Sequence, residues 1–379
     1  MKKNQLVTLG KHIDILSGCA FPSSGFNRNN GVPLIRIRDI LSGKTETYYE
    51  GSYDLKYLIK KGDLLVGMDG DFNREYWKGT DALLNQRVCK ITPNPETLDK
   101  NFLYHFLQKE LDKIHATTDV VTVKHLSVKK IQDIKIRLPS LKEQKRIAAI
   151  LDKADAIRQK REQAIKLADD FLRAKFLEMF GTPANNIHRF PKGTIRDLVD
   201  SVNYGTSAKA SIDSGEYPIL RMGNITYQGR WDFTDLKYLD LSVKEKDKYL
   251  VKEGDLLFNR TNSKELVGKT AVYEEDRPMA FAGYLIRVRP NSIGNNYYIS
   301  GYLNSIHGKI TLMNMCKSIV GMANINAQEL QNIEILIPPK HLQDEYEIIY
   351  KKIKKGLSIY DKSAMQLQLL ASNLSNKYF

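Results

Sequence analysis

The stretch "LPSLKEQKRIAAILDKADAIRQ", Leu138–Gln159, changes near Ser140 from a strand-like ending into a charged, helical pattern. From Ile147, alternating steps of three and four residues meet apolar side chains at every position except Arg161. This spacing is typical of a heptad seam, along which one helix packs against another. The seam residues are Ile147, Ile150, Ala154, Ile157, Ala164, Ala168 and Phe171. They predict a helix of about 38 residues and about 57 Å, which the Gly and Pro of "FGTPANN" should stop after Phe180.

The chain contains two copies of one unit. The block "VPLIRIRDI" (Val32–Ile40) resembles "YPILRMGNI" 185 residues later, and "YLIKKGDLLV" (Tyr57–Val66) resembles "YLVKEGDLLF" 192 residues later. The block "IQDIKIRLPSLKEQ" (Ile131–Gln144) resembles "LQNIEILIPPKHLQ" 199 residues later. Because the three blocks recur in the same order with similar offsets, we interpret the chain as an internal duplication.

The second copy carries its own seam. Adding 199 to each position of the first seam gives a stripe in the same phase, interrupted at Gly356 and Ser363; its apolar members include Ile349, Ile353, Tyr360, Leu367 and Leu370. Two copies related by a pseudo-two-fold axis across the helices should pair them antiparallel, as a spacer between two domains. The alternative is that each helix packs only on its own domain, because Arg161 and Gly356 interrupt the seams.

The rest of each copy is predicted to be an α+β domain. Short runs rich in Val, Ile, Leu and Tyr alternate with Gly, Asn and Asp turns, which indicates strands. The segments "NFLYHFLQKELDKIHA" and "NYYISGYLNSIHGKITLM" are predicted to be helical. We therefore expect four parts: a first domain at 1–140, the central helix at 141–181, a second domain at 182–339 and a C-terminal helix at 340–379.

Composition narrows the class of protein. The formal net charge of +14 fits a polyanionic partner, although charge alone leaves nucleic acid only one option. The sequence contains no run of 18 apolar residues, so no membrane span is predicted, and no apolar segment follows "MKKNQLVTLG", so no signal peptide is predicted. We therefore expect a cytoplasmic protein without membrane contact. Cys19, Cys89 and Cys316 are far apart and are interpreted as small buried hydrophobic residues.

Motifs for catalysis or cofactor binding are weak. The segment "SKELVGKT" ends like a phosphate-binding loop, but Ser263 replaces the first glycine and the following "AVYEED" predicts a strand rather than a helix. No G-x-G-x-x-G segment, Asn-Pro-Pro-Tyr-like motif or H-E-x-x-H spacing occurs, and the scattered histidines are interpreted as fillers. We therefore expect no catalytic, cofactor-binding or metal-binding residues on this chain.

Loops that end the predicted strands carry side chains suited to reading DNA. They lie at matching positions of the two copies, yet their sequences differ: after the shared "GDLL", one copy continues "VGMDGDFNRE" and the other "FNRTNSKE". Arg reads guanine, Asn and Gln read adenine, Asp accepts from cytosine, and Lys and Ser hold phosphates. The candidate DNA-binding residues are Arg36, Arg38, Asp69, Asp71, Asn73, Arg74, Lys78, Gln86, Arg87, Arg221, Asn224, Tyr227, Arg230, Arg260, Asn262, Ser263 and Lys264.

The whole chain resembles the specificity subunit of type I restriction-modification systems. The resemblance rests on "LPSLKEQKRIAAILDKAD", "IPPKHLQDEYEIIYKKI", the paired "GDLL" segments and the two-unit layout. It implies two target-recognition domains, each contacting half of a split DNA sequence, and two conserved helices in an antiparallel coiled coil. It also implies docking of two methyltransferase subunits, which bind S-adenosylmethionine, and of restriction subunits. The second helix departs from the pattern, because "HLQDEYEII" replaces the sequence type seen at "KEQKRI".

From the residues and the resemblance together we expect a non-catalytic reader of double-stranded DNA. It should recognise a bipartite, asymmetric site whose halves lie roughly 10 bp apart, and direct adenine methylation and restriction by partner subunits. Two other functions stay open at this point: a structural protein with two protein-binding heads, and an enzyme such as a fused methyltransferase-nuclease.

Overall fold

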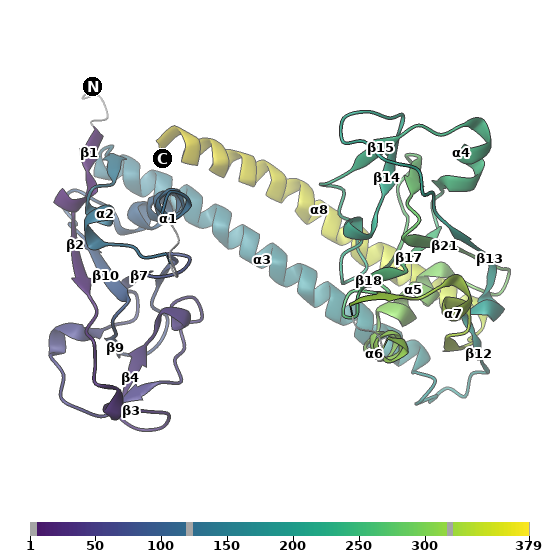
Figure 1. The fold of residues 1–379 in the computed structure, drawn as a ribbon, viewed down its shortest axis with the longest axis horizontal. Helices are drawn as coiled ribbons and strands as arrows, with labels where there is room; N and C mark the ends of the chain where they lie inside the picture. Colours follow the sequence, from purple (N-terminus) through teal and green to yellow (C-terminus); the bar gives the residue numbers. More distant parts are fainter. Residues whose placement is uncertain (1–5, 119–123, 317–320, 379) are drawn as a thin grey trace. The chain divides into compact units, whose positions relative to one another are not determined.

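Helix α3 (Leu141–Phe180) is the long central helix that the heptad seam predicts, and α8 (Lys340–Tyr378) is its copy. They belong to a computed structural model that describes residues 6–118, 124–316 and 321–378, without the side chains of 359–365 and 377–379. The chain divides into unit 1 (Met1–Lys160 with Lys362–Phe379) and unit 2 (Arg161–Asp361). Each unit therefore holds one α+β domain and a section of both long helices (Figure 1).

Unit 1 is built on two sheets. Helix α1 (Lys100–Ala116) packs on the first, an antiparallel sheet in the order β2-β10-β7-β8. The second has the order β3-β5-β4-β9-β6, and its β4 and β9 run parallel. In a separate two-stranded pair, β1 from the start of the chain pairs with β11, the strand that follows the short helix α2 (Val128–Gln132). The strands are β1 (Leu6–Thr8), β2 (Ile13–Ser17), β3 (Phe26–Asn27), β4 (Val32–Ile35), β5 (Tyr48–Tyr49), β6 (Leu58–Ile59), β7 (Leu64–Gly67), β8 (Arg74–Tyr76), β9 (Ala82–Leu84), β10 (Val88–Pro93) and β11 (Lys135–Arg137).

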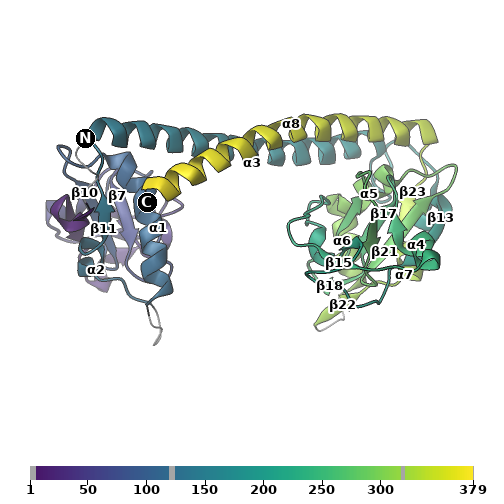
Figure 2. The same cartoon turned by 90° about the horizontal axis from the view of Figure 1, so that it is seen from above.

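Unit 2 repeats this arrangement. Its antiparallel sheet β13-β21-β17-β19 is covered by helix α5 (Asn296–Asn304; Figure 2). Its mixed sheet β15-β14-β20-β16 again contains one parallel pair, β14 with β20. The strands are β12 (Lys192–Thr194), β13 (Val199–Tyr204), β14 (Tyr217–Leu220), β15 (Lys237–Leu239), β16 (Leu250–Val251), β17 (Leu256–Asn259), β18 (Thr261–Ser263), β19 (Thr270–Val272), β20 (Met279–Phe281), β21 (Leu285–Pro290), β22 (Met322–Asn324) and β23 (Glu334–Leu336).

The sequence repeats therefore mark repeats of structure. The two "GDLL" segments begin β7 and β17, which are buried along their whole length because a sheet neighbour lies on either side and apolar clusters cover both faces. The third repeated block forms α2 with β11 in one copy and α7 (Ala327–Gln331) with β23 in the other. This confirms the predicted duplication and the α+β class.

The long helices pair end to start. In unit 2, Phe176 near the end of α3 packs edge-on against Tyr346 near the start of α8, with ring centroids 5.3 Å apart. In unit 1, Ala371 and Leu374 near the end of α8 pack against the core cluster that contains Ile147 of α3. Within each unit, the end of one helix thus meets the start of the other. This is the antiparallel arrangement that the sequence predicts.

The seam itself is only partly packed. Ile147 is buried and most of its other members are half-buried, but Phe171 is 48% exposed and Leu370 is 50% exposed. The expectation for these two was wrong. Near its end, α3 packs on its domain through Leu172, Phe176 and Phe180, which are spaced by four residues. A heptad seam has an average spacing of 3.5 residues, so the buried face of α3 turns away from the predicted seam in this region. The half-buried members are Ile150, Ala154, Ile157, Ala164, Ala168, Ile349, Ile353 and Leu367, and Tyr360 lies outside the described side chains.

Three further local features can be compared with the sequence predictions. The predicted helix at 296–313 is split at Ser305, whose hydroxyl donates to the Tyr302 carbonyl and accepts from the Gly308 N–H, and so caps α6 (Ile306–Met315). Thr270 begins strand β19, so the end of "SKELVGKT" leads into a strand, as predicted, and not into the helix that a phosphate-binding loop requires. The seven-residue helix α4 (Val243–Tyr249) has no counterpart among the predicted elements.

Candidate nucleic-acid interface

Three polar side chains of unit 1 meet where β7 ends and β10 begins. Asp69 follows β7, Arg87 precedes β10, and His125 lies just before α2, where it forms an isolated β-bridge with Asp69. His125 Nδ1 donates to Asp69 Oδ1 at 2.6 Å, and Arg87 Nε lies 3.4 Å from Asp69 Oδ2. We call Asp69, Arg87 and His125 cluster 1. A hollow of about 270 Å³ beside it is lined by Met68, Val88, Leu126 and other residues.

The backbone holds Arg87 in an unusual conformation. Its φ of +71° lies in the left-handed region, which non-glycine residues adopt only when surrounding structure imposes it. The Arg87 carbonyl accepts from the Met68 N–H at 2.8 Å, so the end of β7 fixes this turn. The guanidinium stays more than half exposed, with the Asp69 carboxylate on one side. The surrounding structure therefore holds Arg87 in a strained backbone conformation, which presents its side chain in a fixed orientation.

Unit 2 has an equivalent group at the same place in the repeat. Residues Thr261–Ser263 follow β17 and pair with Met322–Asn324 just before α7, which extends the bridge seen in unit 1 into the pair β18-β22. Thr261 Oγ1 lies 3.2 Å from Asn324 Oδ1, and the Arg260 guanidinium lies 4.7 Å from the centroid of the Tyr204 ring. The Arg260 N–H donates to the Tyr284 carbonyl at 3.0 Å. We call Tyr204, Arg260, Thr261, Tyr284 and Asn324 cluster 2.

The two clusters lie at the same place in the repeated fold but carry different side chains. Each lies where the buried "GDLL" strand ends, beside the residue that precedes the next strand of the sheet. Cluster 1 combines a carboxylate, an imidazole and a guanidinium, whereas cluster 2 combines a guanidinium, an amide, a hydroxyl and two half-exposed tyrosines. These groups complement different base edges. The arrangement can therefore present two different surfaces to nucleic acid.

Some of the predicted residues belong to these clusters or border them. Asp69 and Arg87 are in cluster 1, and Gln86 is exposed beside Arg87. Asp71 and Asn73 lie in the same loop after β7, and the Asn73 carbonyl accepts from the Gly67 N–H. In unit 2, Arg260 is in cluster 2, Asn262 and Ser263 lie in β18 just after it, and Lys264 follows β18.

Other predicted residues of unit 1 have partners outside cluster 1. Arg74 stacks on the Tyr104 ring of α1, 3.5 Å from the ring centroid, and its N–H donates to Gln108. Lys78 pairs with Glu75 at 3.5 Å. Arg38 lies 3.8 Å from Asp39, with most of its side chain exposed.

A repeated turn explains the arginines that end β4 and β14. The Arg36 N–H donates to Asp39 Oδ2 at 2.8 Å, and the Arg221 N–H donates to Asn224 Oδ1 at the same distance. Asn224 is buried and also donates to the carbonyls of Asp232 and Asp235. The Asn224 side chain thus closes a turn rather than facing nucleic acid, which corrects the sequence interpretation. Arg221 itself pairs with Asp235 at 2.8 Å.

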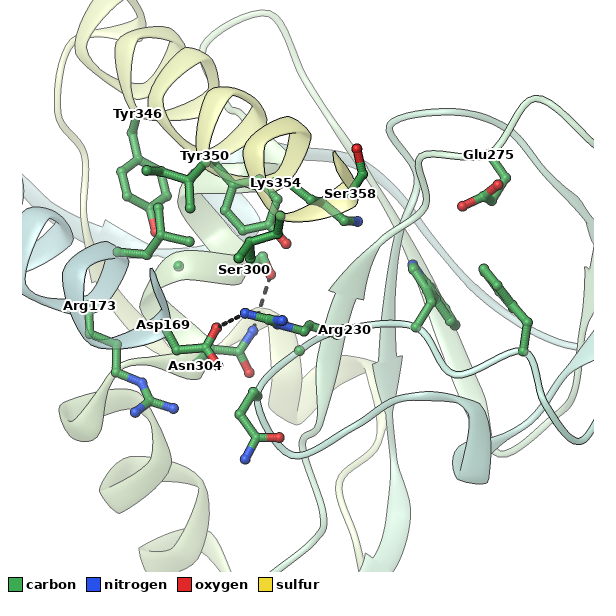
Figure 3. Close-up of a pocket in the computed structure, with 18 residues that line it drawn as sticks. Asp169, Arg173, Arg230, Glu275, Ser300, Asn304, Tyr346, Tyr350, Lys354 and Ser358 are labelled. Atoms are coloured by element: carbon green, nitrogen blue, oxygen red, sulfur yellow. Dashed lines mark hydrogen bonds and ion pairs between the residues drawn. The ribbon is translucent and has the colours of Figure 1, made fainter. Parts of the chain in front are cut away.

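Arg230 joins the second domain to α3. Its Nη2 lies 2.6 Å from Asp169 Oδ1, and both side chains line a cavity of about 320 Å³ in unit 2 (Figure 3). Tyr346, Tyr350 and Ile353 of α8 form an apolar wall of the same cavity. Because its charge is already compensated by a shielded carboxylate, Arg230 is not free to bind a base or phosphate. Tyr227, in the same loop, covers Lys309, whose Nζ lies 4.9 Å from the ring centroid.

The sequence reasoning missed His125, Asn324, Tyr204 and Tyr284. A signal for the first two was present, because adding 199, the offset of the third repeated block, to His125 gives Asn324. Both residues precede the short helix of that block in the structure. No comparable signal marked the tyrosines, since their place depends on which strands pair.

Comparison with known proteins agrees with this architecture. A family model for the type I restriction modification DNA specificity domain matches residues 1–167 and 190–371. The specificity subunit of the type I restriction enzyme EcoBI from Escherichia coli is 30% identical over 98% of this chain and 82% of its own length. That of EcoKI from E. coli strain K12 is 23% identical over 92% of this chain and 80% of its own.

Solved structures show the same fold. The crystal structure of a type I restriction-modification S subunit from M. genitalium matches with a TM-score of 0.67 at 15% identity, covering 100% of this chain and 97% of the other. No helix among the residues described here is long and apolar enough to span a membrane. The extent of the family match, together with the duplicated fold, shows that this chain belongs to the family of type I restriction-modification DNA specificity subunits.

Proposed function

We propose that this chain is the non-catalytic reader of a type I restriction-modification complex, and that it binds a bipartite, asymmetric site in double-stranded DNA. The observation that carries the proposal is the pair of clusters: each lies at the same place in its domain, and their side chains differ. One frame with two sets of reading groups suits two unrelated half-sites. Cluster 1 would read one half-site and cluster 2 the other.

The domain limits follow from the same proposal. Residues 1–140 and 182–339 form the two target-recognition domains, and 141–181 and 340–379 form the conserved helices. Because α3 is one continuous helix of 40 residues, its length would set the spacing of the half-sites. Inserting seven residues, two helical turns, into both helices should lengthen the tolerated spacer and leave each half-site unchanged.

Partner subunits would supply the chemistry. The relatives are named as subunits of restriction enzymes, which supports methyltransferase and restriction subunits as partners of this chain. Two methyltransferase subunits would bind S-adenosylmethionine and methylate adenine in the site, and the complex would act in the cytoplasm, where the DNA is. In unit 2, Leu167 and Phe171 stand one turn apart on α3 with exposed side chains, which supports this helix face as a docking surface.

Binding and methylation assays with the full chain test the proposal. With one methyltransferase subunit added, a duplex carrying the target should be retained in a gel shift, more tightly than a scrambled duplex, and retention should fall steeply with salt. The chain alone should transfer no methyl group from labelled S-adenosylmethionine. Retention of both duplexes with equal affinity would contradict the reader, and methyl transfer by the chain alone would show it to be an enzyme.

A further inference from the structure

Lys309 of α6 carries a buried ammonium group. Its ammonium nitrogen is fully shielded from solvent, and no hydrogen-bond partner for it occurs among residues 6–118, 124–316 and 321–378. The Tyr227 ring lies against it, with its centroid 4.9 Å from Nζ. Buried charges in proteins are ordinarily paired, because an unpaired ion loses its hydration without compensation.

The charged neighbours of Lys309 are also positive. Burial, reinforced by the charges of Arg173 and Lys269, lowers the pKa of Lys309 to about 8. Lys269, just before β19, is only 8% exposed, and burial lowers its pKa too. It forms no ion pair with any described residue. Arg173 of α3 lies 3.6 Å from Asp170, whose side chain is 54% exposed.

Arg173 of α3, Lys269 before β19 and Lys309 of α6 come from three parts of unit 2, and the first two lie close enough for their charges to act on Lys309, whose buried Nζ has no acceptor among the described residues. Asp169, which lines the same cavity as Arg173, is already bonded to Arg230 (Figure 3). Arg173 also lines the 320 Å³ cavity, together with Gln228 and Gly229, the two residues that follow Tyr227. A small anion could reach the cations from this side once the half-exposed Tyr227 ring turns away. A tetrahedral oxyanion would supply the negative charge and the hydrogen-bond acceptors that these cations lack.

We propose that Lys309, Lys269 and Arg173 form a phosphate site, and that its occupant is a backbone phosphate of the bound DNA. This rests on the proposed function, because it assumes that DNA lies against the second domain. A phosphate would accept from the ammonium groups and the guanidinium, and the Tyr227 hydroxyl could donate to it. Such a contact positions the duplex without reading its sequence.

Salt dependence of binding tests the site. Lys309→Met should weaken binding of the full chain, assembled with its methyltransferase subunit, about tenfold at 0.1 M salt, and reduce the slope of log K against log salt by about 0.9. The loss should be equal for target and scrambled duplexes. Lys248→Met is the matched control, because Lys248 also lies over a tyrosine, with Nζ 5.0 Å from the Tyr249 ring centroid, but is exposed. An unchanged slope and affinity in Lys309→Met would overturn the proposal.

Thermal unfolding separates a lost site from a lost fold. Without DNA, Lys309→Met should unfold at a higher temperature than wild type, because it removes an unpaired buried charge. Inorganic phosphate should stabilise wild type more than chloride of equal ionic strength, and should not do so in Lys309→Met. Phosphate stabilisation with an unchanged DNA slope would overturn the DNA assignment, and no stabilisation with no slope change would overturn the site itself.

A failure of the proposed function would give a different result from a failure of the phosphate site. If wild type showed no preference for any target duplex, DNA reading would be wrong whatever Lys309 does. If wild type preferred its target while Lys309→Met matched it in slope, only the phosphate site would be wrong. Arg260→Ala serves as the reference for a reading residue, because it should alter sequence preference more than the salt slope.

Discussion

The side-chain carbonyl of Gln144 accepts a hydrogen bond from the backbone N–H of Asp99, at an N···O distance of 2.8 Å. Its Nε2 donates to the carbonyls of Thr97 and Pro139, so a fully buried amide ties the start of α3 to the start of α1. Gln343 occupies the equivalent place in the second copy and donates to the carbonyls of Ile293 and Pro338, but its own carbonyl oxygen has no partner among the described residues.

This difference predicts that substituting the two glutamines will cost the two units different amounts of stability. Gln144→Ala leaves one donor and two acceptors without partners and should lower the free energy of unfolding of unit 1 by about 2–4 kcal/mol, whereas Gln343→Ala should cost unit 2 about 1–2 kcal/mol. The two tryptophans separate the units, since Trp77 lies in unit 1 and Trp231 in unit 2. Urea unfolding followed by fluorescence in Trp231→Phe and Trp77→Phe backgrounds measures each. Equal losses in the two units would contradict the account.

Asp69 should restrain Arg87 rather than bind DNA by itself. In Asp69→Ala the guanidinium loses its ion pair and His125 loses its acceptor. Affinity for scrambled DNA should therefore rise a few-fold, while discrimination at one base pair of the first half-site should fall by about 1–3 kcal/mol. Competition binding with single-base variants of the target measures both. Asp81→Ala, an exposed carboxylate of the same domain, controls for the change in net charge.

The pH dependence of binding should report Lys309. Its pKa in the free protein is about 8, below the ordinary value of 10.5, and a bound phosphate favours the charged form. Affinity should therefore be full below pH 8 and fall as the pH rises through 8 toward 9.5, with up to one proton taken up on binding. The groups that face Lys309 are Arg173, Lys269 and Tyr227, and of these Lys269 could add to the slope.

The sign of the stability effect follows from the same shift. A lysine whose pKa is lowered on folding destabilises the folded state where it must be charged, so its contribution to the free energy of unfolding rises between pH 8 and about 10.5. Affinities measured at constant salt between pH 7 and 9.5 test the binding effect. In Lys309→Met the fall through pH 8 should be largely absent, and a fall equal to that of wild type would argue against Lys309.

The exposed apolar residues of α3 should bind a partner subunit. Leu167 is 61% exposed and Phe171 lies one turn further along the same face. The double variant Leu167→Ser, Phe171→Ser should weaken association with the methyltransferase subunit tenfold or more, with little change in thermal stability, because neither side chain is part of a core cluster. Analytical ultracentrifugation measures the association. Ile212→Ser, another exposed apolar residue of unit 2, should leave it unchanged.

Features carried by local pattern could be predicted from the sequence. The heptad spacing and the glycine after Phe180 predict α3, and Gly181 indeed has a φ of +66°. The repeat offsets predict that two domains share one topology. Asp69, Arg87 and Arg260 were found because strand-ending loops with unlike side chains follow the shared "GDLL" segments.

What depends on long-range packing could not be predicted. Arg230 reads as a DNA contact in sequence, but a hairpin places it against Asp169, 61 residues away. Phe171 continues an ideal heptad, yet the domain packs on the neighbouring face of α3 through Leu172 and Phe176. The repeat offset to Asn324 marks the position of His125, but not its partners, because Asp69 and Arg87 precede it by a whole helix and several strands.

Methylation mapping in cells tests the central claim most directly. Long-read sequencing should be applied to cells carrying wild type, Arg87→Ala or Arg260→Ala, together with the partner subunits. We predict that Arg87→Ala relaxes or changes bases in one half of the bipartite motif only, and that Arg260→Ala does so in the other half only. Changes in both halves from either variant, or an unaltered motif in both variants, would contradict the assignment of one half-site to each cluster.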